Sequence, residues 1–202
     1  MISQVLMTVL GNPLGIATVA APFVMDHINA GRAKLAAEAS HRNSELTQAN
    51  QIATAVSGTT DNLAYLSKQV MFGIVFRKLS APEDQATWKM YQEALIKWES
   101  SKSTVLAQVE MYFGADCAAT LGKIREDFDT LENQINAAYY KRTTSKWYIE
   151  DKEGSKNDFR KKYLPVWDRL VAEMTELNKE MIRQIQYVEV GSLREKTDLV
   201  RS

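Results

Sequence analysis

Apolar side chains recur at steps of three and four residues along most of the chain. The clearest run lies between residues 88 and 112, with Lys102 as its one polar interruption. Its members are Trp88, Tyr91, Leu95, Trp98, Val105, Val109 and Tyr112. This spacing places side chains on one face of an α-helix. Ser80 and Glu83 have the spacing of a capping box before this helix, and Gly114 is a C-cap candidate after it.

Other stretches repeat this spacing. They are Ile28, Leu35, Ala39, Leu46, Ala49, Ala53 and Val56; Leu63, Leu66, Val70 and Ile74; Cys117, Leu121, Ile124, Phe128, Leu131, Ile135 and Ala138; and Tyr163, Trp167, Leu170, Met174, Leu177 and Met181. The polar run 57–61 predicts a break between the first two helices. Asp116 can cap the helix that begins near Cys117. Residues 143–158 form a polar connection, and Pro165 either starts or kinks the last helix.

Successive apolar seams on long helices predict an all-α fold, an antiparallel bundle of long helices with coiled-coil-like packing. Short connections around Ser80 and Gly114 make their neighbouring helices antiparallel. We expect the bundle to cover residues 27–188, with an apolar segment at residues 1–26 before it. Residues 189–202 are expected to be a flexible tail.

The apolar N-terminal segment contains no charged side chain between Ile2 and Met25. A helix of about 20 apolar residues can cross a bilayer, so a membrane anchor is the favoured interpretation. Pro13 and Pro22 interrupt the segment, which leaves a helix in the core of a soluble bundle as the alternative, and a signal peptide as a third. Basic residues follow the segment, so an anchor would span the inner membrane once and leave the C-terminal domain in the cytoplasm. The core-helix alternative predicts a cytoplasmic protein.

Charge and cysteine content restrict the possible functions. The chain has 25 basic and 25 acidic side chains, a balance that argues against non-specific nucleic-acid binding. Cys117 is its only cysteine, so neither an intramolecular disulfide nor a cysteine-based zinc site can form. Cys117 lies on a predicted apolar face, where a buried structural thiol is favoured over a nucleophile.

Candidate chemistry is sparse. Glu38 and His41 have the Glu-x-x-His spacing of di-iron bundles, but the second motif is missing, so a solvated polar face is favoured. Adjacent acidic residues such as Glu126 and Asp127 are interpreted as surface charges. No phosphate-binding, dinucleotide-binding or hydrolase motif occurs. We therefore predict no catalytic residue, no cofactor and no metal site.

Two aromatic side chains stand apart from the seams. Trp147 and Tyr148 lie in the polar connection, where exposed aromatic residues are typical of binding surfaces. Packing onto the end of the bundle is nevertheless the favoured interpretation. The alternative is that Trp147 and Tyr148 contact a partner.

The middle of the chain resembles a known group of proteins. Tyr91, Leu95 and Trp98, then Tyr112-Phe113-Gly114, then Phe128, are similar to a pattern in bacterial proteins that have an N-terminal membrane anchor and a helical domain. The resemblance implies an anchor and a cytoplasmic bundle, and it implies no activity. This chain departs from the pattern by the prolines in its apolar segment.

These observations favour a non-enzymatic, membrane-anchored helical bundle that binds a protein partner or itself. One alternative is a soluble oligomeric coiled-coil scaffold. Another is a helical protein that perturbs membranes through residues 2–25.

Overall fold

The structure is a computed structural model that describes residues 13–76, 82–144 and 154–194, with side chains described for residues 25–73, 85–139, 157 and 160–194. Four long helices account for most of these residues. They are α2 (Pro13–Phe76), α3 (Pro82–Phe113), α4 (Ala115–Thr144) and α5 (Gly154–Gln186). The predicted all-α fold is confirmed.

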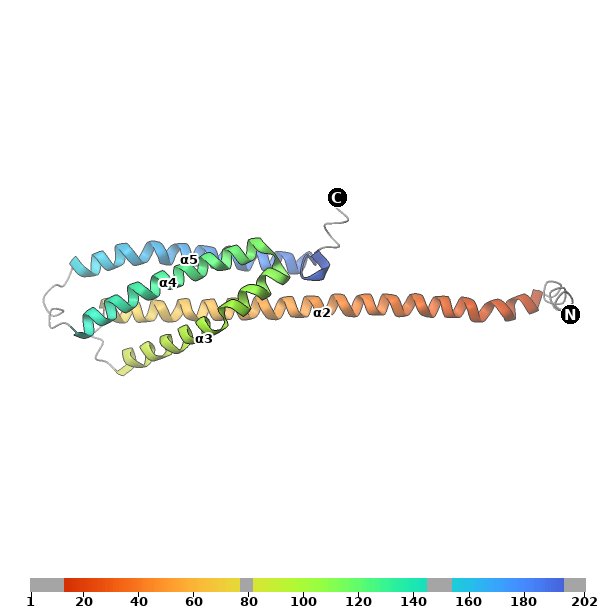
Figure 1. Cartoon of the computed structure of the whole chain (residues 1–202), viewed down its shortest axis with the longest axis horizontal. Helices are drawn as coiled ribbons and strands as arrows, with labels where there is room; N and C mark the ends of the chain where they lie inside the picture. Colours follow the sequence, from red (N-terminus) through yellow and green to blue (C-terminus); the bar gives the residue numbers. More distant parts are fainter. Residues whose placement is uncertain (1–12, 77–81, 145–153, 195–202) are drawn as a thin grey trace. The chain divides into compact units, whose positions relative to one another are not determined.

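The chain divides into two units, residues 1–44 and residues 45–202. We call residues 45–194 the core unit. Within it, the C-terminal part of α2 and the helices α3, α4 and α5 run alongside one another in alternating directions (Figure 1). The core unit begins later than residue 27, where the sequence placed the start of the bundle.

The apolar seams predicted from the sequence form the interior of the core unit. Buried seam residues include Val56, Leu63, Trp88, Tyr91, Leu95, Trp98, Val109, Cys117, Leu121, Ile124, Phe128, Leu131, Ile135, Tyr163, Leu170, Met174, Leu177 and Met181. Aromatic rings join neighbouring helices, since Trp88 stacks on Tyr139 with ring centroids 3.8 Å apart. Burial of such side chains is the main favourable contribution to folding.

The turn between α3 and α4 forms as the glycine predicts. Gly114 adopts a φ of +88°, a conformation that is energetically unfavourable for any residue that has a side chain. Its N–H donates to the carbonyl of Glu110 at 2.9 Å, and its own carbonyl accepts from Ala118 at 3.1 Å. Asp116, which was expected to cap α4, lies inside the first turn of this helix instead. There its carboxylate still interacts favourably with the helix dipole.

The predicted break at residues 57–61 is wrong, because α2 continues through it. Polar side chains there bond to the helix itself or to a neighbour. The Thr60 hydroxyl donates to the carbonyls of Val56 and Ser57, and the Ser57 hydroxyl donates to Asn178 on α5 at 2.5 Å. Thr60 is buried between the apolar seam residues Val56 and Leu63. Tertiary packing thus outweighs the local preference of these residues for a turn.

The C-terminal part differs from the prediction in two ways. Helix α5 begins at Gly154, within residues 143–158 that were predicted to form a polar connection, and contains Pro165 in its interior. A proline there removes one helical hydrogen bond, a cost that the packing of α5 on its neighbours offsets. Residues 189–194 pack against the helices of the core unit, with Val190 completely buried, so the flexible tail predicted from residue 189 does not begin there. Residues 195–202 lie outside the described residues.

The apolar N-terminal segment is described only from Pro13, where α2 begins. Pro22 lies inside this helix, so it does not end the segment's helical structure. Among the described residues, no helix has a stretch long and apolar enough to cross a membrane. Residues 2–12 of the predicted anchor lie outside the described residues, so the anchor stays a prediction.

Candidate functional site

One face of α2 carries apolar side chains that the described residues leave open to solvent. Every residue from 25 to 44, which we call the exposed segment, is exposed. Met25, Ile28 and Leu35 keep 59%, 43% and 67% of their surface accessible. Large apolar side chains gathered on one helix face are a feature of interaction sites.

The apolar positions of the exposed segment continue the spacing of the core unit. Steps of three and four connect Met25, Ile28, Arg32, Leu35, Ala39 and Arg42, and the same steps continue through Leu46, Ala49, Ala53, Val56, Thr60, Leu63, Ser67 and Val70. We call these the seam positions. From residue 46 onward they are buried or half-buried. The same heptad pattern therefore packs against other helices in one part of α2 and is exposed in the other.

Charged side chains accompany the exposed seam. Arg32 and Arg42 occupy seam positions, and Glu38 lies beside the seam. Asp26 and Lys34 lie off the seam. A charged residue at a seam position restricts which helix can pack there and in which direction, because its charge needs a partner.

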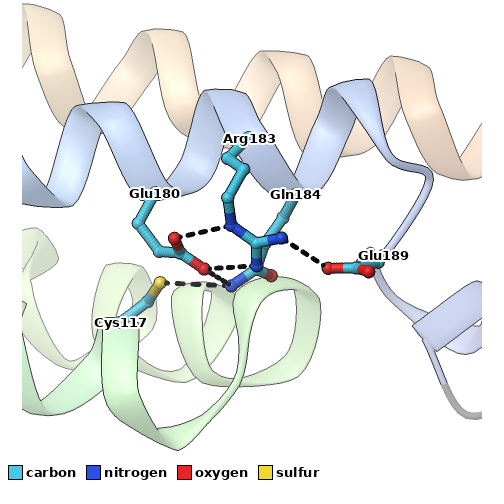
Figure 2. A network of polar contacts seen from close by, with 5 residues as sticks. All are labelled: Cys117, Glu180, Arg183, Gln184 and Glu189. Atoms are coloured by element: carbon cyan, nitrogen blue, oxygen red, sulfur yellow. Dashed lines mark hydrogen bonds and ion pairs between the residues drawn. The ribbon is translucent and has the colours of Figure 1, made fainter. Parts of the chain in front are cut away.

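A second cluster lies where α5 meets the start of α4 (Figure 2). Arg183 donates to both carboxylate oxygens of Glu180, at 2.8 Å and 2.7 Å, and to Glu189 at 2.9 Å. Gln184 donates to Glu180 at 2.9 Å and lies 3.6 Å from the Cys117 sulfur. These hydrogen bonds lower the pKa of Glu180 to about 2, with Arg183 as the largest cause. The pKa of Arg183 is raised by the same two carboxylates.

The end of α5 turns the chain so that Glu189 can reach Arg183. Val188 has a φ of +61°, and the Glu189 N–H donates to the carbonyl of Gln184 at 2.8 Å. This is a Schellman-type helix end in which valine occupies the position that usually holds glycine. A β-branched residue is strained there, so the contacts beyond it must hold the turn.

Those contacts come from residues 189–194, which we call the C-terminal segment. The Gly191 N–H donates to the carbonyl of Tyr112 at 2.9 Å, and the Ser192 N–H donates to Glu45 at 3.1 Å. The Tyr112 hydroxyl in turn donates to Gln48 on α2. The C-terminal segment therefore joins α2, α3 and α5 at the Gly114 end of the core unit.

Cys117 is buried, with 2% of its surface accessible, as its seam position predicted. Burial is the largest cause that raises the pKa of its thiol, to about 11, and nearby Glu180 adds to the effect. At neutral pH the thiol is protonated, and the protonated form is a poor nucleophile. The cluster around it is thus built for packing and hydrogen bonding.

Asp127 departs from its interpretation as a surface charge. Its carboxylate is 3% exposed and accepts hydrogen bonds from Arg169 on α5, at 2.8 Å and 3.1 Å from Nε. Burial raises the pKa of Glu173 nearby, and the Asp127 charge raises it further. Sequence reasoning missed this contact and the Arg183 cluster, because both join residues from different elements and have no local motif.

The other predicted sites have simple outcomes. Trp147 and Tyr148 lie outside the described residues, so their role as partner contacts stays a prediction. Glu38 and His41 are exposed on the exposed segment. Across the part of the chain that the structure describes, no three His, Cys, Asp or Glu side chains are grouped to hold a metal ion.

Comparisons with protein-family models, with curated proteins and with solved structures find no match for this chain. The resemblance of residues 91–128 to anchored bacterial proteins stays a prediction. Function must therefore be argued from the exposed segment and from the core unit.

Proposed function

We propose that this chain is a non-enzymatic protein-interaction module. Its core unit is an antiparallel bundle with coiled-coil-like packing, and its exposed segment binds another helix. The observation that carries the proposal is the accessible apolar seam of Met25, Ile28, Leu35 and Ala39 on a helix that continues into the core unit.

Energetics support a binding role for the exposed segment. Helices in water gain most of their stability from packing an apolar face, and a segment without such packing is marginal. A second helix seated on the seam would remove its apolar side chains from water, at about 25 cal/mol per Å² of apolar surface. The clusters around Cys117 and Asp127 offer no comparable surface, because their polar side chains form hydrogen bonds within the core unit.

Site-specific photo-crosslinking in the cells that make the protein tests the proposal. We expect a photoreactive amino acid in place of Leu35 to yield a covalent adduct with a protein. The matched control is the same substitution at Ala37, which is exposed on the opposite face of the helix. Adducts of equal yield from both positions, or from neither, would contradict the proposal.

The proposed inner-membrane location has its own test. The uncharged residues 2–25 support it, and the proposal places the core unit in the cytoplasm. The full chain is then recovered with membranes after carbonate extraction, whereas a chain that lacks residues 2–25 is recovered in the supernatant. A full chain that remains in the supernatant argues for the alternative, a soluble oligomeric scaffold.

A further inference from the structure

We infer that the helix bound by the exposed segment is the exposed segment of a second copy of this chain, in antiparallel orientation. This inference rests on the proposed function and names the partner of that same site. It rests on the positions of charged and apolar side chains on and beside the exposed seam.

A parallel pair in register is unfavourable. In such a pair each seam position faces its own counterpart, so Arg32 would meet Arg32 and Arg42 would meet Arg42. Like charges placed together at the centre of an interface cost several kcal/mol. Arg32 would find no carboxylate within one helical turn of its level on the partner helix.

An antiparallel pair centred between Arg32 and Leu35 gives Arg32 a partner. Arg32 then lies within one helical turn of Glu38 of the second copy, and Arg42 no longer meets its own counterpart. Two-fold symmetry repeats the Arg32–Glu38 pair, so two ion pairs flank the seam. Both residues are exposed in the single chain and accessible to such a partner.

The apolar residues fit the same arrangement. Ile28 lies opposite Ala39 of the second copy, which alternates a large and a small side chain across the seam. The aliphatic stem of Arg32 can lie on Leu35 of the second copy while its guanidinium reaches outward to the carboxylate. The stem of Arg42 can lie on Met25 in the same way. Apolar contact and charge pairing therefore require one and the same register.

Charge exchange tests the pairing, with sedimentation of the purified full chain over a concentration series. We expect Arg32→Glu to weaken self-association by about tenfold or more, because it places like charges together. The double variant R32E/E38R restores association, because the swapped charges again meet between copies. The matched control Lys34→Glu makes the same charge change off the seam and leaves association unchanged.

Disulfide trapping tests the orientation. Chains carrying Ile28→Cys and chains carrying Ala39→Cys are oxidised alone and in mixture, and the unmodified chain with its buried Cys117 is the control. The antiparallel pair gives a disulfide only in the mixture, because only there do two introduced cysteines come within bonding distance. Disulfides within each single population would show a parallel pair and overturn the inference.

The two proposals fail in different ways. A chain that stays monomeric at every concentration, with no mixed disulfide, overturns the second copy as partner. If Leu35 still crosslinks to a different protein in cells, the interaction module itself stands. If Leu35 gives no adduct and the chain is monomeric, both proposals fall.

Discussion

The side chain of Arg183 connects helix α5 to the C-terminal segment. It pairs with Glu180 on its own helix and with Glu189 in the C-terminal segment, while Glu180 also accepts from Gln184 beside Cys117. Hydrogen bonds between charged groups are stronger than neutral ones, but their strength depends on the ionised carboxylate. The hydrogen bonds between Arg183 and Glu180 therefore depend on pH.

The sign of that dependence follows from the lowered pKa of Glu180. Its pKa falls from 4.5 to about 2 in the folded chain, so the unfolded chain takes up this proton first. The stabilisation is complete above about pH 4.5 and is lost as the pH falls towards 2. We expect Glu180→Gln to lower the free energy of unfolding at neutral pH, and the deficit to shrink as the pH falls. Urea titrations at a series of pH values measure it.

Glu176→Gln is the control for this experiment. Glu176 pairs with Lys179 on the exposed face of the same helix, and exposed pairs contribute little to stability. This variant is expected to follow the wild type throughout the pH range. A deficit for Glu180→Gln that stays constant down to pH 2 would show that its carboxylate charge does not hold the network.

At this scale the sequence predicts apolar contacts better than polar ones. The burial of Cys117 followed from its place in a seam, because periodicity alone identifies the inner face. The partner of Asp127 could not be found in that way, since Arg169 lies on another helix. Glu189 was assigned to a tail because no sequence pattern within residues 189–194 predicts their hydrogen bonds to Arg183 and Tyr112.

Helix α2 shows how tertiary packing overrides local signals at the scale of an element. Ser57, Gly58 and Thr60 have turn preferences, yet the helix continues through them. Gly58 has open space around the position of an added Cβ, whereas Gly114 has a φ of +88° and faces the side chain of Arg194. The two glycines therefore perform different roles.

This difference gives a matched pair of variants. We expect Gly58→Ala to stabilise the protein by about 0.5–1 kcal/mol, because alanine is favoured over glycine inside a helix. Gly114→Ala is expected to destabilise it by about 1–2 kcal/mol, because alanine resists a positive φ. Equilibrium unfolding in urea measures both, and a loss of stability in Gly58→Ala would argue that residues 57–61 leave the helix.

Element boundaries could be predicted where the chain has a strong stop signal. Gly114 placed the α3–α4 turn correctly. The start of α5 was placed too late because residues 143–158 are polar and were interpreted as a connection, with Pro165 as either a start or a kink of the helix. A proline inside a helix is tolerated when the rest of the helix is packed, and sequence alone does not show that packing.

The whole molecule consists of two units that obtain their stability in different ways. All the buried apolar side chains of the described residues belong to the core unit, the first of them being Ala49, whereas the residues of the exposed segment are accessible. The seam spacing was predicted along both units, but the sequence could not show which part packs within the chain. Which part of the seam is buried becomes known only from the positions of the other helices in the structure.

The division predicts how a chain that lacks residues 1–44 behaves. Because the buried residues and the contacts of the C-terminal segment all lie at Glu45 or beyond, we expect residues 45–202 to keep the urea midpoint of the dilute full chain. Removal of residues 1–44 also removes the exposed seam, so the shortened chain is expected to sediment as a monomer at concentrations where the full chain associates. A midpoint that falls with the deletion would mean that residues 1–44 contribute to the stability of the core unit. Retained self-association would place the interface on the core unit instead, since helix α2 would no longer offer Met25, Ile28 or Leu35 to a second copy.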